Sequence, residues 1–181
     1  ERDPQKPIDR ELLMRMVRTL RHRGPDDEGH VVLPGVGLAM RRLAIVDVSG
    51  GQQPFASEDG AIQLVANGEI YNHLELRNIL ISHGHDFRSE SDIEVLVHAY
   101  EQWGEAFLSR VHGMFALALW DSRTQTLLVA RDRAGEKPLY YAPTASGLLF
   151  ASEIKGQLSC PAVTREIDLE ALDQFLTYEY V

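Results

Sequence analysis

The sequence predicts an α+β fold, in which helices and strands occupy separate stretches of one domain. A chain of 181 residues has the length of a single domain. Its periodic segments follow the order helix, strands, two helices, strands, which is typical of that class. Residues 114–120 are apolar at every position, so we expect a strand that is buried on both faces, with cover on each side of its sheet.

The first helix is predicted over residues 9–20. Asp9 is a favourable N-cap, and Leu13, Met16, Val17 and Leu20 form an apolar stripe at i, i+3, i+4 and i+7. After a basic loop, short apolar runs predict strands at residues 30–33, 36–41, 43–46 and 62–66.

Two further helices have clear start signals. Asn72 with Glu75, and Ser91 with Glu94, have the spacing of a capping box, and Gly84 and Gly104 are suitable stops. Besides the strand at 114–120, strands are predicted at residues 126–130, 139–141 and 148–151. A last amphipathic stretch begins near residue 168.

Composition and charge exclude several classes of protein. The apolar fraction of 44% and the charged fraction of 25% are ordinary globular values. No apolar run approaches the ~18 residues that cross a bilayer, and no signal-peptide pattern is present. The net charge of −9 has the wrong sign for binding nucleic acid or an anionic membrane. The single cysteine, Cys160, excludes a disulfide framework and is typical of a reducing compartment, so we expect a cytoplasmic protein.

The segment around Asn67, Gly68 and Glu69 is the most informative for function. Asn-Gly is a strong hairpin signal, but a capped helix follows it instead of a second strand. A strand that runs through a tight turn into a helix would expose an amide, a backbone N–H and a carboxylate at one sheet edge. An amide beside a glycine N–H suits a negative oxygen, as in an oxyanion hole, and the plain hairpin remains the alternative.

Other polar residues permit more than one interpretation. Arg42 could grip a carboxylate with its planar fork or form a surface ion pair. Asp92 is expected in the first turn of a helix, where an acid is favoured by the helix dipole alone. Cys160 is interpreted as a packing or surface residue. The cluster at residues 83–86, with His83 and His85, is too short to predict a metal site, so none is expected. Residues 49–51 lack the pattern of a phosphate loop.

Seven motifs together resemble one known family. They stand in order at residues 21–26, 42–47, 67–72, 91–94, 113–116, 131–140 and 151–155. The set is similar to the N-terminal glutaminase domain of glutamine-hydrolysing asparagine synthetase, a class II glutamine amidotransferase. The resemblance spans nearly the whole chain, and seven motifs in register make it specific.

The resemblance implies a fold and a domain division. The fold is that of an N-terminal-nucleophile hydrolase, a four-layer αββα sandwich of two antiparallel sheets. Residues 1–165 correspond to the glutaminase domain, and residues 166–181 to the start of an ATP-dependent synthetase domain.

The resemblance also implies an activity and roles for matched residues. The parent enzyme would hydrolyse glutamine and pass the ammonia to an ATP-activated aspartate, giving asparagine, glutamate, AMP and diphosphate. Arg42 would hold the α-carboxylate of glutamine, and Asp92 with Glu69 would hold its α-ammonium. Asn67 and Gly68 would form the oxyanion hole. The remaining substrate-binding positions are Leu43, Ala44, Ile45 and Val46.

One departure concerns the nucleophile, which in this family is a cysteine at the very N-terminus. The chain begins at Glu1 without that cysteine, and a first strand on the order of ten residues would precede this point. We therefore interpret the sequence as a fragment or a processed product that is inactive by itself. The alternatives are an amidotransferase with a different acceptor and a non-catalytic scaffold domain, as in β-lactam synthetase.

The expected ligands and partners follow from the resemblance. No cofactor or metal is expected in this domain, whereas ATP and Mg²⁺ would bind the synthetase domain. The partners are L-glutamine and the synthetase domain of the same chain, and a homodimer is left open.

Overall fold

A computed structural model describes residues 7–44, 47, 50–145 and 147–179 of the chain. The elements in order are α1 (Arg10–Arg18), β1 (Asp27–Leu33), β2 (Val36–Arg42), β3 (Phe55–Ala56), β4 (Ile62–Ile70), α2 (His73–Ser82), α3 (Val95–Trp103), the 3-10 helix η1 (Gly104–Ser109), β5 (Gly113–Asp121), β6 (Thr126–Arg131), β7 (Tyr140–Thr144), β8 (Gly147–Ala151), α4 (Ile154–Gln157) and α5 (Leu169–Tyr178). None of the helices within these ranges is long and apolar enough to cross a membrane.

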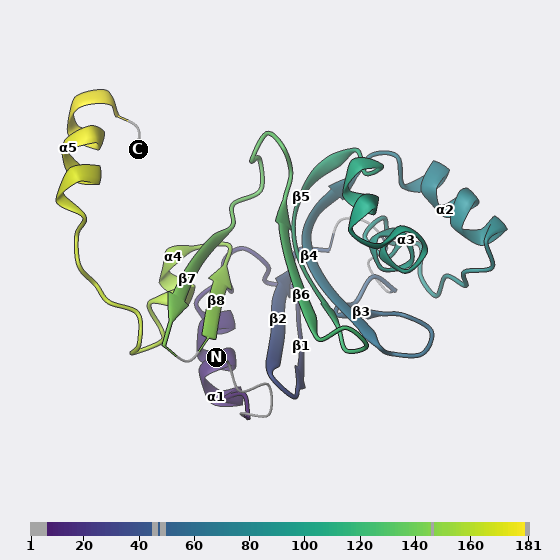
Figure 1. The fold of residues 1–181 in the computed structure, drawn as a ribbon, viewed down its shortest axis with the longest axis horizontal. Helices are drawn as coiled ribbons and strands as arrows, with labels where there is room; N and C mark the ends of the chain where they lie inside the picture. The colour runs from purple at the N-terminus through teal and green to yellow at the C-terminus, as the bar shows by residue number, and fades with distance from the viewer. Residues whose placement is uncertain (1–6, 45–46, 48–49, 146, 180–181) are drawn as a thin grey trace.

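The strands and helices form four layers, as predicted. An antiparallel sheet in the order β3-β4-β5-β6 has α2 and α3 on one side. The antiparallel hairpins β1-β2 and β7-β8 lie on its other side, where α1 packs against β2, and α4 packs against β7, β8 and α1 (Figure 1). Helix α5 stands apart from these layers and has no buried residue.

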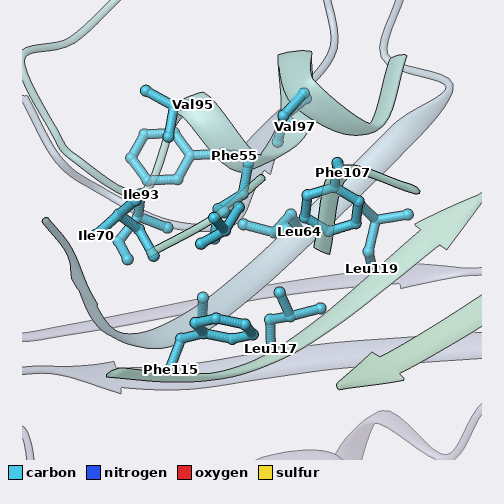
Figure 2. Close-up of a cluster of buried hydrophobic side chains, with 14 of the residues drawn as sticks. Phe55, Leu64, Ile70, Ile93, Val95, Val97, Phe107, Phe115, Leu117 and Leu119 are labelled. Carbon is cyan, nitrogen blue, oxygen red and sulfur yellow. The ribbon is translucent and has the colours of Figure 1, made fainter. Parts of the chain in front are cut away.

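The larger hydrophobic core fills the space between the four-stranded sheet and helices α2 and α3. Leu64 and Ile70 of β4 and Leu117 and Leu119 of β5 belong to this core, where Leu64 and Leu119 lie beside Phe107 of η1 and Ile70 lies beside Ile93 (Figure 2). Leu64 and Ile70 are six residues apart and Leu117 and Leu119 are two apart, and an even separation places both residues of each strand on one face.

A second core lies between the sheet and the hairpin layer. Val36 and Leu38 of β2 pack with Val65 of β4 and with Ala118 and Trp120 of β5. Strand β5 thus contributes side chains to both cores, and the prediction of a strand buried on both faces is confirmed.

Some strand predictions need correction. The strand predicted at residues 43–46 is wrong at Leu43 and Ala44, which have no strand structure, and residues 45 and 46 lie outside the described ranges. The strand predicted at residues 62–66 continues to Ile70. Strand β3 and helix α4 were not predicted, because a pair of strand residues and a single helical turn leave too short a periodic pattern.

The helix caps agree with the sequence only in part. Asp9 caps α1 as predicted, since its Oδ1 accepts a hydrogen bond from the N–H of Leu12 at 2.9 Å. Asn72 occupies the N-cap of α2, but its amide bonds the backbone of Arg110 and His112 instead of forming a capping box. The sequence could not show this, because those partners lie about 40 residues along the chain.

The first and last of the seven motifs meet in an ionic cluster around Glu153. Its Oε1 accepts from His22 Nε2 at 2.8 Å and from Arg23 Nη1 at 3.2 Å, and its Oε2 lies 2.9 Å from Lys155 Nζ. The hydrogen bond from Lys155, and those from His22 and Arg23, outweigh the effect of burial and lower the pKa of Glu153 to about 2.

The Glu153→Gln variant should be less stable than the native protein at pH 7, by roughly 1 kcal/mol or less. Because the folded-state pKa lies below the ordinary value of 4.5, the carboxylate stabilises the fold above about pH 4.5. This contribution is lost as the pH falls from about 4.5 to about 2. Urea unfolding of both proteins at pH 7 and pH 3 would show the difference shrinking at the lower pH. An equal difference at both pH values would contradict the assignment.

Candidate functional site

The candidate site lies where the core between the sheets ends. Along β2, Val36, Leu38 and Met40 contribute to that core, and the alternation of a strand puts Arg42 on the same face. Along β4, Val65 is the last core residue on that face, and Asn67 and Glu69 follow it as exposed side chains. Past the end of this core, β2 therefore carries the cation of Arg42, and β4 carries the amide of Asn67 and the carboxylate of Glu69.

Arg42 is held in place by the loop that follows β2. The residue is only 7% exposed, and its Nη2 donates to the backbone carbonyl of Asp47 at 2.6 Å. Gly51 lies directly against the guanidinium, because a Cβ on this residue would come within 2.4 Å of Nη2. A glycine is needed here to leave room for the arginine.

Asp47 joins this loop to the segment that precedes α3. Its Oδ1 accepts from the N–H of Gly50 and its Oδ2 from the N–H of Glu90, both at 2.8 Å. The backbone of Asp47 has a positive φ of 46°, an uncommon conformation that aspartate tolerates better than most residues. Sequence analysis missed this positioning role, because Glu90 lies 43 residues away.

Asp92 connects the segment that precedes α3 to β4 through a hydrogen bond. The residue is 5% exposed, and its Oδ2 accepts from the backbone N–H of Ile70 at 2.8 Å. Its predicted place in the first turn of a helix is wrong, since α3 begins at Val95. The predicted capping box is also absent, because the carboxylate of Glu94 accepts hydrogen bonds from Ser89 and the N–H of Arg88. A buried aspartate that precedes the helix is therefore not explained by the helix dipole.

Asn67, Gly68 and Glu69 lie inside β4, and the predicted tight turn at this point is wrong. Their partners in β5 are Ala116, Phe115 and Met114, in that order. A Cβ on Gly68 would come within 2.2 Å of the backbone oxygen of Met114. The glycine thus permits a close approach of β5, and the unbroken pairing of β4 with β5 through these residues excludes the hairpin interpretation.

The N–H of Gly68 points to the edge of β4 that faces away from β5. Along a strand, alternate residues direct their backbone groups to the same side. Ala66 and Ile70 direct theirs away from β5, since Gln53 bonds the N–H and carbonyl of Ala66 at 2.7 and 3.0 Å, and Asp92 bonds the N–H of Ile70. Gly68 lies between them, so its N–H emerges between Gln53 and Asp92.

The loop that follows β6 carries two carboxylates, Asp132 and Glu136, that act together with Glu69 on Tyr71. Burial would raise the pKa of Asp132, but hydrogen bonds from the N–H groups of Lys137, Glu136 and Phe115 outweigh it and lower this pKa. Desolvation and the charges of Glu136, Glu69 and Asp132 raise the pKa of the neighbouring Tyr71. The carboxylates of Glu136, Glu69 and Asp132 thus all act on Tyr71, next to the end of β4.

The other predicted positions are less informative. Leu43 is 55% exposed, and the N–H of Ala44 donates to Asp26 Oδ2 at 2.9 Å. Ile45 and Val46 lie outside the described residues. Cys160 is buried just after α4, in the helix layer beyond the hairpins. A surface hollow next to η1, lined in part by His112 and Arg133, contains none of the predicted substrate-binding residues.

The glutamine amidotransferase domain family matches residues 2–181, and the chain belongs to that family. Glutamine phosphoribosylpyrophosphate amidotransferase from Bacillus subtilis, solved with ADP and GMP, has the same fold, with a TM-score of 0.67 at 23% identity. The match covers 86% of this chain and 40% of that one. The predicted N-terminal-nucleophile fold is confirmed.

Within the family, the chain is similar to asparagine synthetases. It is 45% identical over 157 residues to asparagine synthetase [glutamine-hydrolyzing] 2 of Bacillus subtilis, which covers 87% of this chain and 21% of the relative. It is also 44% identical over 139 residues to amidase chyE of Penicillium rubens, covering 76% of this chain and 20% of the relative. The chain thus spans about a fifth of the length of these two proteins.

The Gly51→Ala variant should remain folded but bind L-glutamine more weakly, by at least about tenfold. The new Cβ would displace the guanidinium of Arg42, which can move because it is the end of a flexible side chain, and a misplaced fork loses bidentate bonds. The measurement is KM for glutamine in the full-length protein, with circular dichroism as the check on folding. A native KM would show that the position of Arg42 is unimportant for binding.

Proposed function

We propose that the site binds L-glutamine as a zwitterion and hydrolyses its side-chain amide. The observation that carries this proposal is the link from Asp47 to Glu90, which brings the loop that holds Arg42 against the segment that holds Asp92. A guanidinium on one side of the site and a buried carboxylate on the other match the two charged groups of an α-amino acid.

Each residue has a defined task in this proposal. Arg42 holds the α-carboxylate with parallel N–H···O bonds, and Asp92 and Glu69 receive the α-ammonium. The Asn67 amide and the Gly68 N–H donate to the amide oxygen, which becomes negative when the tetrahedral intermediate forms. The N–H of Gly68 has a suitable direction for this, at the edge of β4 between Gln53 and Asp92.

We assign the nucleophile to an N-terminal cysteine of the full-length protein, as the family resemblance implies. Its thiolate would add to the amide carbon, and collapse of the intermediate would expel ammonia and leave a thioester. Water would then hydrolyse the thioester to glutamate and restore the thiol. Cys160 is unsuited to this role, because it is buried near α4, outside the candidate site.

For the whole protein we propose asparagine synthesis from aspartate, with ATP and Mg²⁺ bound by a synthetase domain of the same chain. The similarity to named asparagine synthetases supports this. Helix α5, which has no buried residue, fits the proposed boundary near residue 165. The similarity to an amidase at nearly equal identity favours a second candidate, an amidotransferase with a different acceptor. The free cysteine fits the cytoplasm as the proposed location.

The test is an assay of the full-length protein with L-glutamine, ATP and aspartate. We expect glutamate from glutamine alone, and asparagine when ATP and aspartate are added. Release of glutamate without formation of asparagine would support glutamine hydrolysis and indicate that the ammonia goes to another acceptor. A folded protein that releases no ammonia from glutamine would overturn the proposal and favour a scaffold domain.

A further inference from the structure

A second group of polar side chains converges at α3, apart from the candidate glutamine site. Glu58 comes from the loop between β3 and β4, and His85 from the loop between α2 and α3. His98 and Glu101 stand three apart on α3, so they share one face of that helix. One ligand atom from each of the four lies within 4.8 Å of the other three.

The distances within this cluster fit a central ion better than direct hydrogen bonds. His98 Nδ1 lies 3.4 Å from Glu101 Oε2 and 3.5 Å from Glu58 Oε1. His85 Nδ1 lies 3.6 Å from Glu58 Oε1 and 3.7 Å from Glu101 Oε2. Ion-paired N–H···O bonds are shorter, about 2.7–2.9 Å. Ligands at about 2.0–2.1 Å around a tetrahedral zinc ion are separated by about 3.3–3.4 Å, close to the distances found.

Both imidazoles are oriented as metal ligands usually are. Each turns Nδ1 to the centre of the cluster, and its Nε2 faces a side-chain oxygen outside it, as the second nitrogen of a ligating histidine usually does. His85 Nε2 lies 3.4 Å from Gln102 Oε1. His98 Nε2 lies 3.8 Å from Glu94 Oε1, is buried, and has no hydrogen-bond partner among the described residues.

Each of the two carboxylates also accepts a hydrogen bond from a neighbouring donor. Glu101 Oε1 accepts from Arg123 Nη2 at 3.2 Å, which leaves its Oε2 toward the centre. Glu58 Oε1 accepts from the N–H of Asp86 at 3.1 Å. The side chain of His98 is 2% exposed, and its ring packs edge-on against Phe87 at 4.6 Å between centroids. Two carboxylates and two imidazoles thus converge around the buried ring of His98, with Glu58 on the exposed side, where the carboxylates would attract a divalent cation.

We propose that Glu58, His85, His98 and Glu101 bind one Zn²⁺ ion. Imidazole and carboxylate ligands at tetrahedral spacing suit zinc, and four protein ligands leave no open position, so the role is structural. The ion joins two loops to α3, the helix whose preceding segment carries Asp92. Of the pair noted in the sequence, only His85 takes part, because the Nδ1 of His83 lies against the carbonyl of Ile79 at 2.8 Å.

The test is titration of the chelator-treated protein with Zn²⁺ and with Co²⁺. We expect uptake of one Zn²⁺ per chain by calorimetry, a higher Tm with Zn²⁺, and the strong visible absorption of tetrahedral Co²⁺. The variants are Glu58→Gln and His85→Asn, whose side chains lie in loops and are more exposed than that of His98. Each should weaken zinc binding by at least about tenfold, since even outer partners of a ligand contribute ten- to hundredfold.

The His83→Asn variant is the matched control, because His83 is an exposed histidine two residues from His85. It should bind zinc as the native protein does. The proposal is overturned if the native protein takes up no stoichiometric zinc, or if His85→Asn and His83→Asn bind it equally well. Cobalt in a weakly absorbing octahedral environment would also overturn it.

Discussion

Asn67→Ala in the full-length enzyme should lower kcat by roughly a hundred- to a thousandfold, with a much smaller change in KM for glutamine. That is the usual effect of removing one oxyanion-hole donor. Asn67 is exposed on the face of β4 that continues beyond the core between the sheets, beside Gly68. In bound glutamine the amide oxygen is neutral, whereas in the tetrahedral intermediate it is negative, so the lost bond affects the transition state most.

Steady-state kinetics separates this role from two others. A residue that grips the ground-state substrate would raise KM and leave kcat unchanged. A residue needed only for strand pairing would reduce the yield of folded protein without a specific kinetic effect. Asn78→Ala, an exposed asparagine on α2, is the control for the substitution itself. A native kcat in folded Asn67→Ala would remove Asn67 from the mechanism.

Asp92→Asn should raise KM for glutamine by roughly ten- to a hundredfold, since hydrogen bonds to charged groups contribute about 1.5–3 kcal/mol. The asparagine keeps the shape of the side chain, and its carbonyl can still accept from the N–H of Ile70, so the strand remains in place. What it loses is the negative charge that we propose as the partner of the α-ammonium of glutamine.

Glu90→Gln is the matched control for this variant, because the Glu90 side chain is 84% exposed and only its backbone contacts Asp47. It should leave KM unchanged. If Asp92→Asn binds glutamine as well as the native enzyme, Asp92 serves only to hold the end of β4. Asp92→Ala, which also leaves the buried N–H of Ile70 without its partner, should be less stable than Asp92→Asn.

Features set by local chemistry or by strand alternation could be predicted from the sequence. The cap at Asp9 depends on the neighbouring turn, and the fully apolar run in β5 required cover on both faces. The strand predicted at residues 36–41 is confirmed, and its continuation by one residue puts Arg42 on the face of Val36, Leu38 and Met40.

Features set by distant contacts could not be predicted. Asn-Gly favours a turn locally, but pairing with β5 keeps Asn67 and Gly68 in a strand. The roles of Asp47 and Gly51 depend on the folded positions of Glu90 and Arg42. The four residues of the proposed zinc site come from three separate segments, so their spacing along the chain contains no ligand pattern.

The central claim is that Arg42 binds the α-carboxylate of the substrate, and two competitive inhibitors test it most directly. L-Glutamate has both α groups, and 4-aminobutanoate lacks the α-carboxylate. Their inhibition constants would be measured against glutamine hydrolysis by the native enzyme and by Arg42→Lys, in which the ammonium offers only a point charge. We predict that the native enzyme prefers L-glutamate by at least about tenfold and that Arg42→Lys loses most of this preference. An equal preference in both enzymes would contradict the account.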